Sequence, residues 1–145
     1  MITRMSWYCA IAVAFVAGAL CTSQSTRAQA TQSSAGRVFE LRVYHTYPGR
    51  LHALEANFRD HNILFLRKHG ITSIGYWTPQ DSPASENTLI FILAYDSRES
   101  ATRDWKAFQE DPEWQKVAKA SLADGPIVEK VESTFMTPAD YSELK

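Results

Sequence analysis

Cysteine is scarce in this sequence. The chain of 145 residues contains only Cys9 and Cys21. Both lie within residues 1–30, so the rest of the chain forms no disulfide and offers no cysteine to a structural zinc ion. The segment after residue 30, long enough for one ordinary domain, must therefore be stabilised by a packed core.

Positive charge is not in excess either. The chain has 15 Lys and Arg residues against 16 Asp and Glu residues, and removal of Arg4 and Arg27 with an N-terminal segment leaves 13 against 16, a formal charge of −3. The sequence shows no basic cluster after residue 30. Because phosphate binding needs clustered positive charge, nucleic acid is not expected as a partner.

Several catalytic signatures are missing as well. The sequence has no G-x-S-x-G turn, no glycine-rich phosphate loop and no H-E-x-x-H helix. It therefore shows no recognisable motif for acyl transfer, nucleotide chemistry or zinc-dependent hydrolysis. No two of the four histidines are four residues apart, as helical metal ligands are; they are His45, His52, His61 and His69. We therefore predict no metal site and no cofactor. A haem held by one histidine is the alternative that these patterns leave open.

Residues 1–30 have the pattern of an export signal. Arg4 precedes an apolar run over residues 8–20, and Ala28-Gln29-Ala30 provides a small-x-small cleavage site. The run is shorter than the roughly 20 residues that a membrane-spanning helix needs. The sequence predicts cleavage after residue 30, a flexible lead-in over 31–36 and a periplasmic or secreted product with no membrane segment. A lipoprotein attached through Cys21 and an uncleaved anchor are the alternatives.

The remaining chain alternates between strand-like and helix-like patterns. Period-two alternation over 37–47 predicts a strand, and helical periodicity over 50–69 predicts a helix that stops at Gly70. The order β-α-β-β-α-β is the split pattern of the ferredoxin-like fold. We expect an α+β domain over 37–138 with a four-stranded antiparallel sheet and both helices on one face. The other predicted elements are strands over 71–78, 87–95 and 127–136, a two-piece helix over 96–125, a loop over 79–87 and a tail over 139–145. The first piece of that helix is predicted to start with a capping box of Asp96 and Glu99, and the second with Asp111 as N-cap before Pro112.

Two helices cover only one face of such a sheet. The first and third predicted strands nevertheless carry apolar or aromatic residues on both faces. Apolar surface left uncovered to this extent usually marks an interface. We therefore predict a homodimer in which two open sheet faces meet and form an α+β barrel.

His61 interrupts an apolar stripe of the first predicted helix. Leu54, Phe58, His61 and Phe65 follow the spacing of one helical face, so His61 is either a hydrogen-bonded core residue or the polar group of a pocket. On the pocket hypothesis it is a catalytic base, because an ordinary histidine pKa of about 6.5 permits proton exchange near neutral pH. The predicted ligand is a small apolar or aromatic molecule.

The candidate ligand contacts are Arg42, Tyr44, Tyr76, Trp77, Tyr95 and Trp105. An ion pair with Glu40 is the alternative role for Arg42. For the aromatic residues the alternative is a place in the core or in the dimer interface.

Three separated blocks of the sequence resemble the NIPSNAP family, a branch of the dimeric α+β barrel superfamily. They are ELRVYHTYPG (40–49), FRDHNILFLRKHGITSIGYW (58–77) and DPEWQKVAKAS (111–121). The resemblance implies the same ferredoxin-like dimer. Relatives in the wider superfamily include cofactor-free monooxygenases acting on aromatic polyketides, haem enzymes and enzymes that degrade small molecules, but a shared fold does not transfer their chemistry.

Two functional hypotheses follow. The first is an exported protein that binds a small molecule in a pocket between sheet and helices. If this protein is catalytic, the expected chemistry is proton transfer or cofactor-independent oxygenation. The second hypothesis is a non-catalytic dimeric interaction module that binds another protein through its surface and the 79–87 loop.

Overall fold

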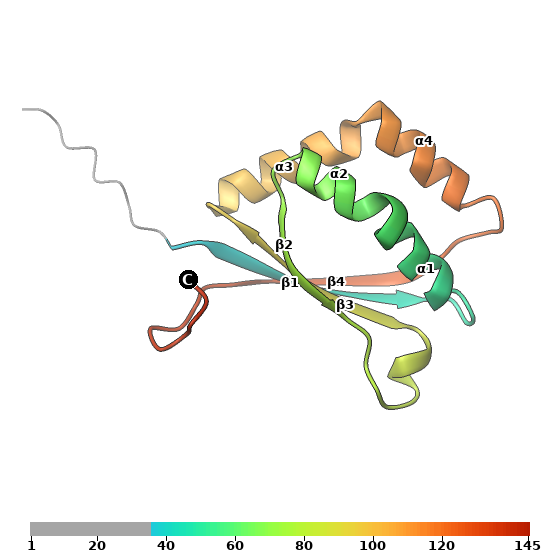
Figure 1. The fold of residues 1–145 in the computed structure, drawn as a ribbon, viewed down its shortest axis with the longest axis horizontal. Coiled ribbons are helices and arrows are strands. Elements are labelled where there is room, and N and C mark those ends of the chain that lie inside the picture. The colour runs from blue at the N-terminus through green and yellow to red at the C-terminus, as the bar shows by residue number, and fades with distance from the viewer. Residues whose placement is uncertain (1–35) are drawn as a thin grey trace, which may run out of the picture. The chain divides into compact units, whose positions relative to one another are not determined.

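The computed structural model describes residues 36–145 (Figure 1). The predicted signal segment, and the predicted lead-in except for Gly36, lie outside the described residues. No helix within the described part of the chain is long and apolar enough to cross a membrane. The strands are β1 (Val38–Thr46), β2 (Thr72–Trp77), β3 (Thr88–Tyr95) and β4 (Val128–Met136); the helices are α1 (Leu51–Asn57), η1 (Phe58–Asn62), α2 (Ile63–Lys68), η2 (Ala84–Glu86), α3 (Arg98–Glu110) and α4 (Pro112–Ser121).

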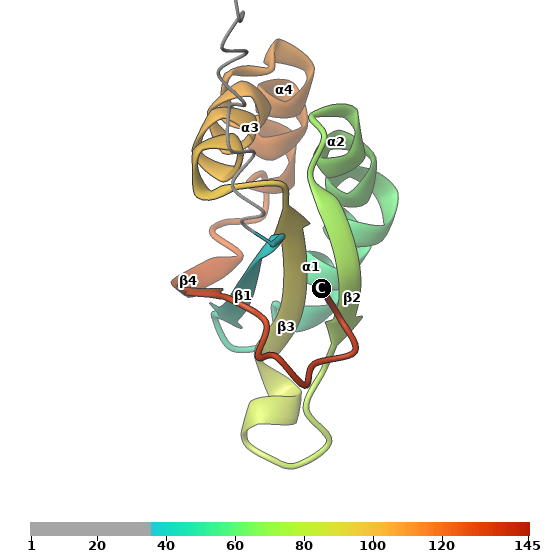
Figure 2. The same ribbon diagram turned by 90° about the vertical axis from the view of Figure 1, so that its left-hand side faces the viewer.

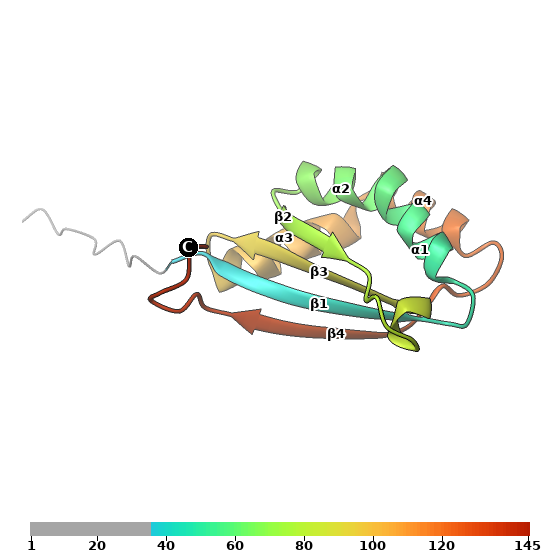
Figure 3. The same ribbon diagram turned by 60° about the horizontal axis from the view of Figure 1, so that its bottom comes forward.

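The four strands form one antiparallel sheet in the order β2-β3-β1-β4. The helices α1 to α4 lie over one face of this sheet, and no helix of residues 36–145 covers the other face (Figures 2 and 3). The predicted ferredoxin-like α+β fold is therefore confirmed. The apolar strand β3 lies in the interior of the sheet between β1 and β2, as its nearly continuous hydrophobic sequence requires.

The core lies between the sheet and the helices. Phe91 and Leu93 of β3 are 1% and 0% exposed, and they pack with Leu54 and Phe58 of the first helix and with Phe108 of α3. Full burial of one such side chain contributes about 1.5–3 kcal/mol. Because the strands alternate, the even-numbered residues of β1, from Glu40 to Thr46, face this core.

A π-helical turn changes which residues of the first helix are buried. Helix α1 continues into α2 through the π turn η1, which closes hydrogen bonds from i to i+5 and so inserts one extra residue. One residue corresponds to about 100° of helical rotation. The buried residues are accordingly Leu54, Phe58, Asn62 and Leu66, whereas His61 is exposed. The predicted placement of His61 in the apolar stripe was wrong, because the π turn puts Asn62 there instead.

The helix-free face of the sheet, called here the open face, is apolar. Leu41 and Val43 of β1 and Ile90 and Ile92 of β3 are half-buried on it, and Trp77 at its β2 edge is 50% exposed. The C-terminal tail returns to one end of this face, where it lines a small cavity together with strand residues; these are Phe39, Ile92, Met136, Thr137, Pro138, Ser142 and Leu144.

Candidate functional site

A cavity of about 270 Å³ lies between the sheet and the helical layer. Its volume is close to the lower end of the range for small-molecule sites, roughly 300–1,000 Å³. Rings dominate its walls: Phe108 and Trp114 have centroids 4.6 Å apart, and Tyr44 and Phe91 have centroids 5.1 Å apart. We call this cavity the aromatic pocket. Its lining residues are Tyr44, Leu54, Asn57, Phe58, Asn62, Leu66, Phe91, Trp105, Phe108, Trp114, Ala118, Ser121, Leu122, Pro126, Ile127 and Val128.

Two asparagines bring polar groups to the wall of the aromatic pocket. The Oδ1 atoms of Asn57 and Asn62 are both buried and have no hydrogen-bond partner, and Asn62 as a whole is 9% exposed. A buried acceptor without a partner costs about 1–3 kcal/mol, so such atoms are uncommon and call for an explanation. Sequence reasoning missed both residues.

A buried carboxylate stands behind one wall of the pocket. Glu40 is 2% exposed, and its Oε2 accepts hydrogen bonds from the Tyr95 hydroxyl at 2.6 Å and from Trp105 Nε1 at 3.0 Å. Its Oε1 accepts from the Ser133 hydroxyl at 2.6 Å and from Arg42 Nη1 at 3.0 Å. These five residues form the Glu40 network. The network fixes the indole of Trp105, one wall of the aromatic pocket.

The charges of this network neutralise each other. Arg42 pairs with Glu40, which confirms the ion pair considered for it, and its guanidinium also lies 4.2 Å from the ring centroid of Trp105. Burial and the hydrogen bond to Glu40 raise the pKa of Tyr95, so its phenol stays protonated and donates. Burial likewise raises the pKa of Tyr44, with Arg42 opposing the rise. The pocket wall is therefore uncharged near neutral pH.

The predicted site residues do not form one site. Tyr44 and Trp105 line the aromatic pocket, and Tyr95 and Arg42 belong to the network behind Trp105. Tyr76 and Trp77 line a separate cavity at the β2 edge, although the Tyr76 ring stacks 5.5 Å from that of Phe91.

His61 lines a different, open groove between the first helix and α4. The wall of this groove is partly apolar, and its charged residues are Arg50, Asp60, Lys116 and Asp124. The groove adjoins the aromatic pocket, since Asn57, Ser121 and Ile127 line both. A ligand in the aromatic pocket would not contact His61, because His61 is absent from the wall of that pocket. Its role as a catalytic base stays a prediction.

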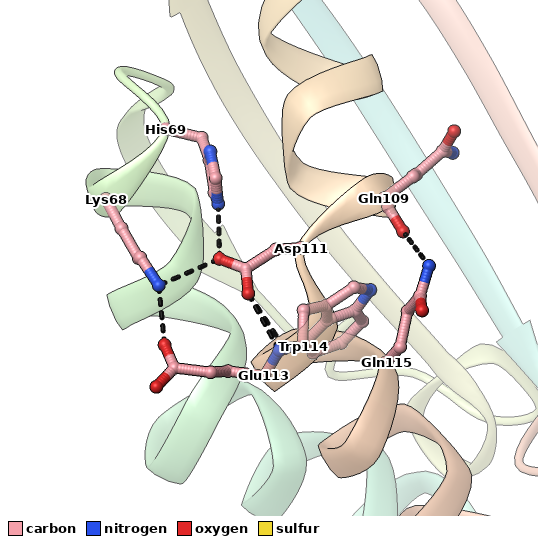
Figure 4. Close-up of polar contacts among 7 residues, drawn as sticks. All are labelled: Lys68, His69, Gln109, Asp111, Glu113, Trp114 and Gln115. Carbon is pink, nitrogen blue, oxygen red and sulfur yellow. Dashed lines mark hydrogen bonds and ion pairs between the residues drawn. The ribbon is translucent and has the colours of Figure 1, made fainter.

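A second carboxylate, Asp111, joins the end of α2 to the start of α4 within the helical layer (Figure 4). Asp111 Oδ2 lies 2.8 Å from His69 Nε2 and 2.9 Å from Lys68 Nζ at the end of α2. Asp111 Oδ1 accepts from the backbone N–H groups of Glu113 and Trp114 at 2.8 and 3.4 Å, which makes it the helix cap predicted from Asp-Pro. Lys68 and then His69 hold the pKa of Asp111 below its usual range. The contact positions Trp114, another wall of the pocket.

Metal ligands are not gathered anywhere in residues 36–145, where no three His, Cys, Asp or Glu side chains are grouped as an ion would require. The arrangement observed instead is a neutral, ring-lined pocket with amide groups at its wall. Such a pocket can surround a flat apolar molecule and offer it hydrogen bonds.

The NIPSNAP family model matches residues 39–143. Among solved structures, this chain is similar to a NIPSNAP family protein of unknown function from Agrobacterium tumefaciens, with 23% identity, a TM-score of 0.67 and coverage of 77% of this chain and 96% of that one. A search of curated proteins found no match.

Two oxygenases share the fold at lower identity. A cofactor-independent oxygenase from Streptomyces nogalater has 13% identity and a TM-score of 0.51, with coverage of 75% of this chain and 99% of that one. A monooxygenase from Streptomyces coelicolor, in complex with the ligand nanaomycin D, has 14% identity and a TM-score of 0.53, with coverage of 74% and 92%. At these identities the likeness shows the ferredoxin-like α+β fold alone.

Proposed function

The chain belongs to the NIPSNAP family, and we propose that it binds a small, largely aromatic molecule in the aromatic pocket. The observation that carries the proposal is the pocket itself, because a volume of about 270 Å³ between packed layers is not left by a filled core. Its ring-lined wall suits a flat apolar ligand, and the few polar groups fix the orientation of that ligand.

We make binding, rather than turnover, the proposed function. The fold supports a link to oxygenases, since a cofactor-independent oxygenase and a monooxygenase share it. However, the predicted base, His61, lies outside the aromatic pocket. Oxygen consumption by the protein in the presence of a bound ligand is the measurement that would extend the proposal to catalysis.

A pair of alanines on α4 allows a matched test of binding. Ala118 lines the aromatic pocket, whereas Ala120, two residues later on the same helix, is exposed and does not. Ala118→Phe fills the pocket, and Ala120→Phe adds the same ring outside it. Trp105 and Trp114 in the wall report binding through their fluorescence.

We expect p-cresol, a simple aromatic probe, to change the tryptophan fluorescence of the wild type and of Ala120→Phe in a saturable way. The Ala118→Phe variant should show at least a tenfold weaker response. Equal responses of the two variants would place binding elsewhere. The absence of any response in the wild type would remove the proposed function and leave the interaction-module hypothesis as the better one.

We also propose a homodimer formed through the open face, whose half-buried Leu41, Val43, Ile90 and Ile92 are the observation that supports it. Ile92→Asp places a charge on this face and should give a monomer in analytical ultracentrifugation. Leu64→Asp is the control, because Leu64 is 59% exposed on α2 and away from the sheet. Dissociation by Leu64→Asp alone would move the interface to the helices.

Export is proposed from the sequence of residues 1–30. Expression of the full chain in a bacterial host, followed by mass spectrometry of the product in the periplasm or medium, should show a new N-terminus at Thr31. An intact N-terminus in the membrane fraction would favour the uncleaved anchor. A lipid-modified product that begins at Cys21 would favour the lipoprotein.

A further inference from the structure

The structure contains a pair of polar groups that the packing of the protein does not use. Five buried side-chain atoms in the described part of the chain have no hydrogen-bond partner, and two of them, Oδ1 of Asn57 and Oδ1 of Asn62, belong to residues of the aromatic pocket. Buried polar groups normally find partners, so two orphan acceptor oxygens on one cavity wall indicate that the pocket receives a hydrogen-bond donor.

The π turn explains why the two amides share a wall. Residues five apart in a regular α-helix are about 140° apart around the axis, because each residue advances about 100°. In η1 the hydrogen bonds run from i to i+5, so Asn57, just before the turn, and Asn62, its last residue, come to the same side. π turns inside α-helices frequently occur at functional sites.

Two other side-chain polar groups of the wall are already engaged. Trp105 Nε1 donates to Glu40 Oε2 at 3.0 Å and contacts the Tyr95 hydroxyl at 2.7 Å, and the Ser121 hydroxyl donates to the carbonyl of Ala118 at 2.8 Å. The wall includes no acidic, basic or histidine side chain. A carboxylate or an ammonium group would find no counter-charge there, so the ligand must be neutral.

We propose that Asn57 and Asn62 form a paired amide subsite that selects a neutral aromatic ligand bearing a hydroxyl group. A hydroxyl donates one hydrogen bond and accepts others, whereas an amide offers one acceptor oxygen and a donor NH₂. One hydroxyl therefore pairs with the oxygen of one amide and the NH₂ of the other. This inference rests on the proposed function and adds the chemical class of its ligand.

Two probes of nearly the same shape test the subsite. In p-cresol a hydroxyl replaces one methyl group of p-xylene, so the two molecules fill the same space and differ in hydrogen bonding. We expect the wild type to bind p-cresol about tenfold more tightly than p-xylene. With p-cresol a buried amide gains a hydrogen-bond partner, whereas with p-xylene it stays without one, and a difference of this kind corresponds to about a factor of ten in the dissociation constant.

The variants are Asn62→Leu and Asn57→Leu, which keep a branched side chain of similar shape and remove the amide. Each should reduce the preference for p-cresol by at least about fivefold, because p-cresol loses a hydrogen-bond partner while the more apolar wall binds p-xylene at least as tightly as in the wild type. The melting temperature without ligand should be equal or higher, because an unsatisfied buried amide has been removed.

Three results would overturn the subsite while retaining the pocket: equal binding of both probes by the wild type, equal weakening of both probes in the variants, and a melting temperature lowered by several degrees with the preference intact. The last result would make the asparagines structural. Failure of both probes to bind the wild type would remove the proposed function as well, so the two failures are distinguishable.

Discussion

Trp105 belongs both to the Glu40 network and to the wall of the aromatic pocket, and these two regions differ in the hydrogen bonding of their buried acceptors. On the sheet side, Glu40 is 2% exposed and both of its oxygens accept hydrogen bonds from surrounding side chains. On the pocket side, the Oδ1 atoms of Asn57 and Asn62 accept none. In the Glu40 network, Arg42 Nε is the one buried side-chain atom without a partner among the described residues, and the carboxylate itself is fully engaged, so we assign this region to the framework. The two asparagine oxygens at the pocket can still accept hydrogen bonds from another molecule.

Asp111 also belongs to the framework. It is 6% exposed and holds the end of α2 to the start of α4 through His69, Lys68 and two backbone N–H groups. The comparison therefore makes a simple prediction: removal of a polar group from the framework destabilises the fold, and removal of one from the pocket wall does not.

The largest effect is expected for Glu40→Leu. Removal of the carboxylate leaves the largely buried charge of Arg42 without its partner. Tyr95 and Ser133 lose their acceptor, and Trp105 keeps only the Tyr95 hydroxyl. Breaking a buried pair by removing one partner costs about 3–5 kcal/mol. Urea unfolding monitored by circular dichroism measures the loss. Glu40→Gln, which keeps one acceptor oxygen, should lose less. A decrease of less than about 1 kcal/mol in the free energy of unfolding of Glu40→Leu would contradict a structural role for the Glu40 network.

A smaller loss is expected for Tyr95→Phe. The variant removes one donor to Glu40, and hydrogen bonds to charged groups contribute about 1.5–3 kcal/mol. Trp105 Nε1 still donates to the same oxygen, which keeps the effect below that of Glu40→Leu. The same urea titration provides the measurement. A larger loss than for Glu40→Leu would show that the phenol acts outside the network.

The third prediction concerns pH. The pKa of Asp111 is lowered in the folded protein, mainly by Lys68 and then by His69, so its carboxylate contributes stability above the unfolded pKa of about 3.9. That contribution is lost as the pH falls from this value through the folded pKa. Asp111→Asn should lower the melting temperature by a few degrees near neutral pH, and the difference from the wild type should shrink on acidification. A difference that is constant down to pH 2 would contradict the ionic role.

The smallest effect on stability is expected for Asn62→Leu. Its melting temperature should equal or exceed that of the wild type, in contrast to the framework variants. Differential scanning fluorimetry of the four variants side by side ranks them directly. If the melting temperature of Asn62→Leu falls as much as that of Tyr95→Phe, the pocket wall and the framework do not differ in the way we propose.

Much of the framework was predictable from the sequence. Alternation over 37–47, the Gly70 stop and the Asp111-Pro112 helix start each gave an element within a few residues of its observed bounds. The cap of α3 was misplaced by one residue, because Ser97 and Ser100, rather than Asp96 and Glu99, form its capping box. Such errors are small because local hydrogen bonding and hydrophobic periodicity decide these features.

The site was harder to predict, for two physical reasons. The π turn inserts one residue into a helix without a sequence signature of its own, so α-helical periodicity placed His61 where Asn62 lies. The alternation in β1 predicted two different faces, but it did not predict which face the helices cover. The helices cover the face that carries Tyr44 and the Glu40 network, although this face is the more polar one. Whether a buried polar group is hydrogen-bonded depends on partners that are distant in sequence, so it cannot be predicted from a local sequence pattern.

The most direct test of the central claim is the melting temperature of the wild type and of Ala118→Phe at increasing concentrations of p-cresol. A ligand that binds only the folded state stabilises it, by about 2.7 kcal/mol at a hundredfold excess over the dissociation constant. We predict that p-cresol raises the melting temperature of the wild type and leaves that of Ala118→Phe unchanged. An equal rise in both proteins, or no rise in the wild type, would contradict the assignment of the aromatic pocket as a binding site.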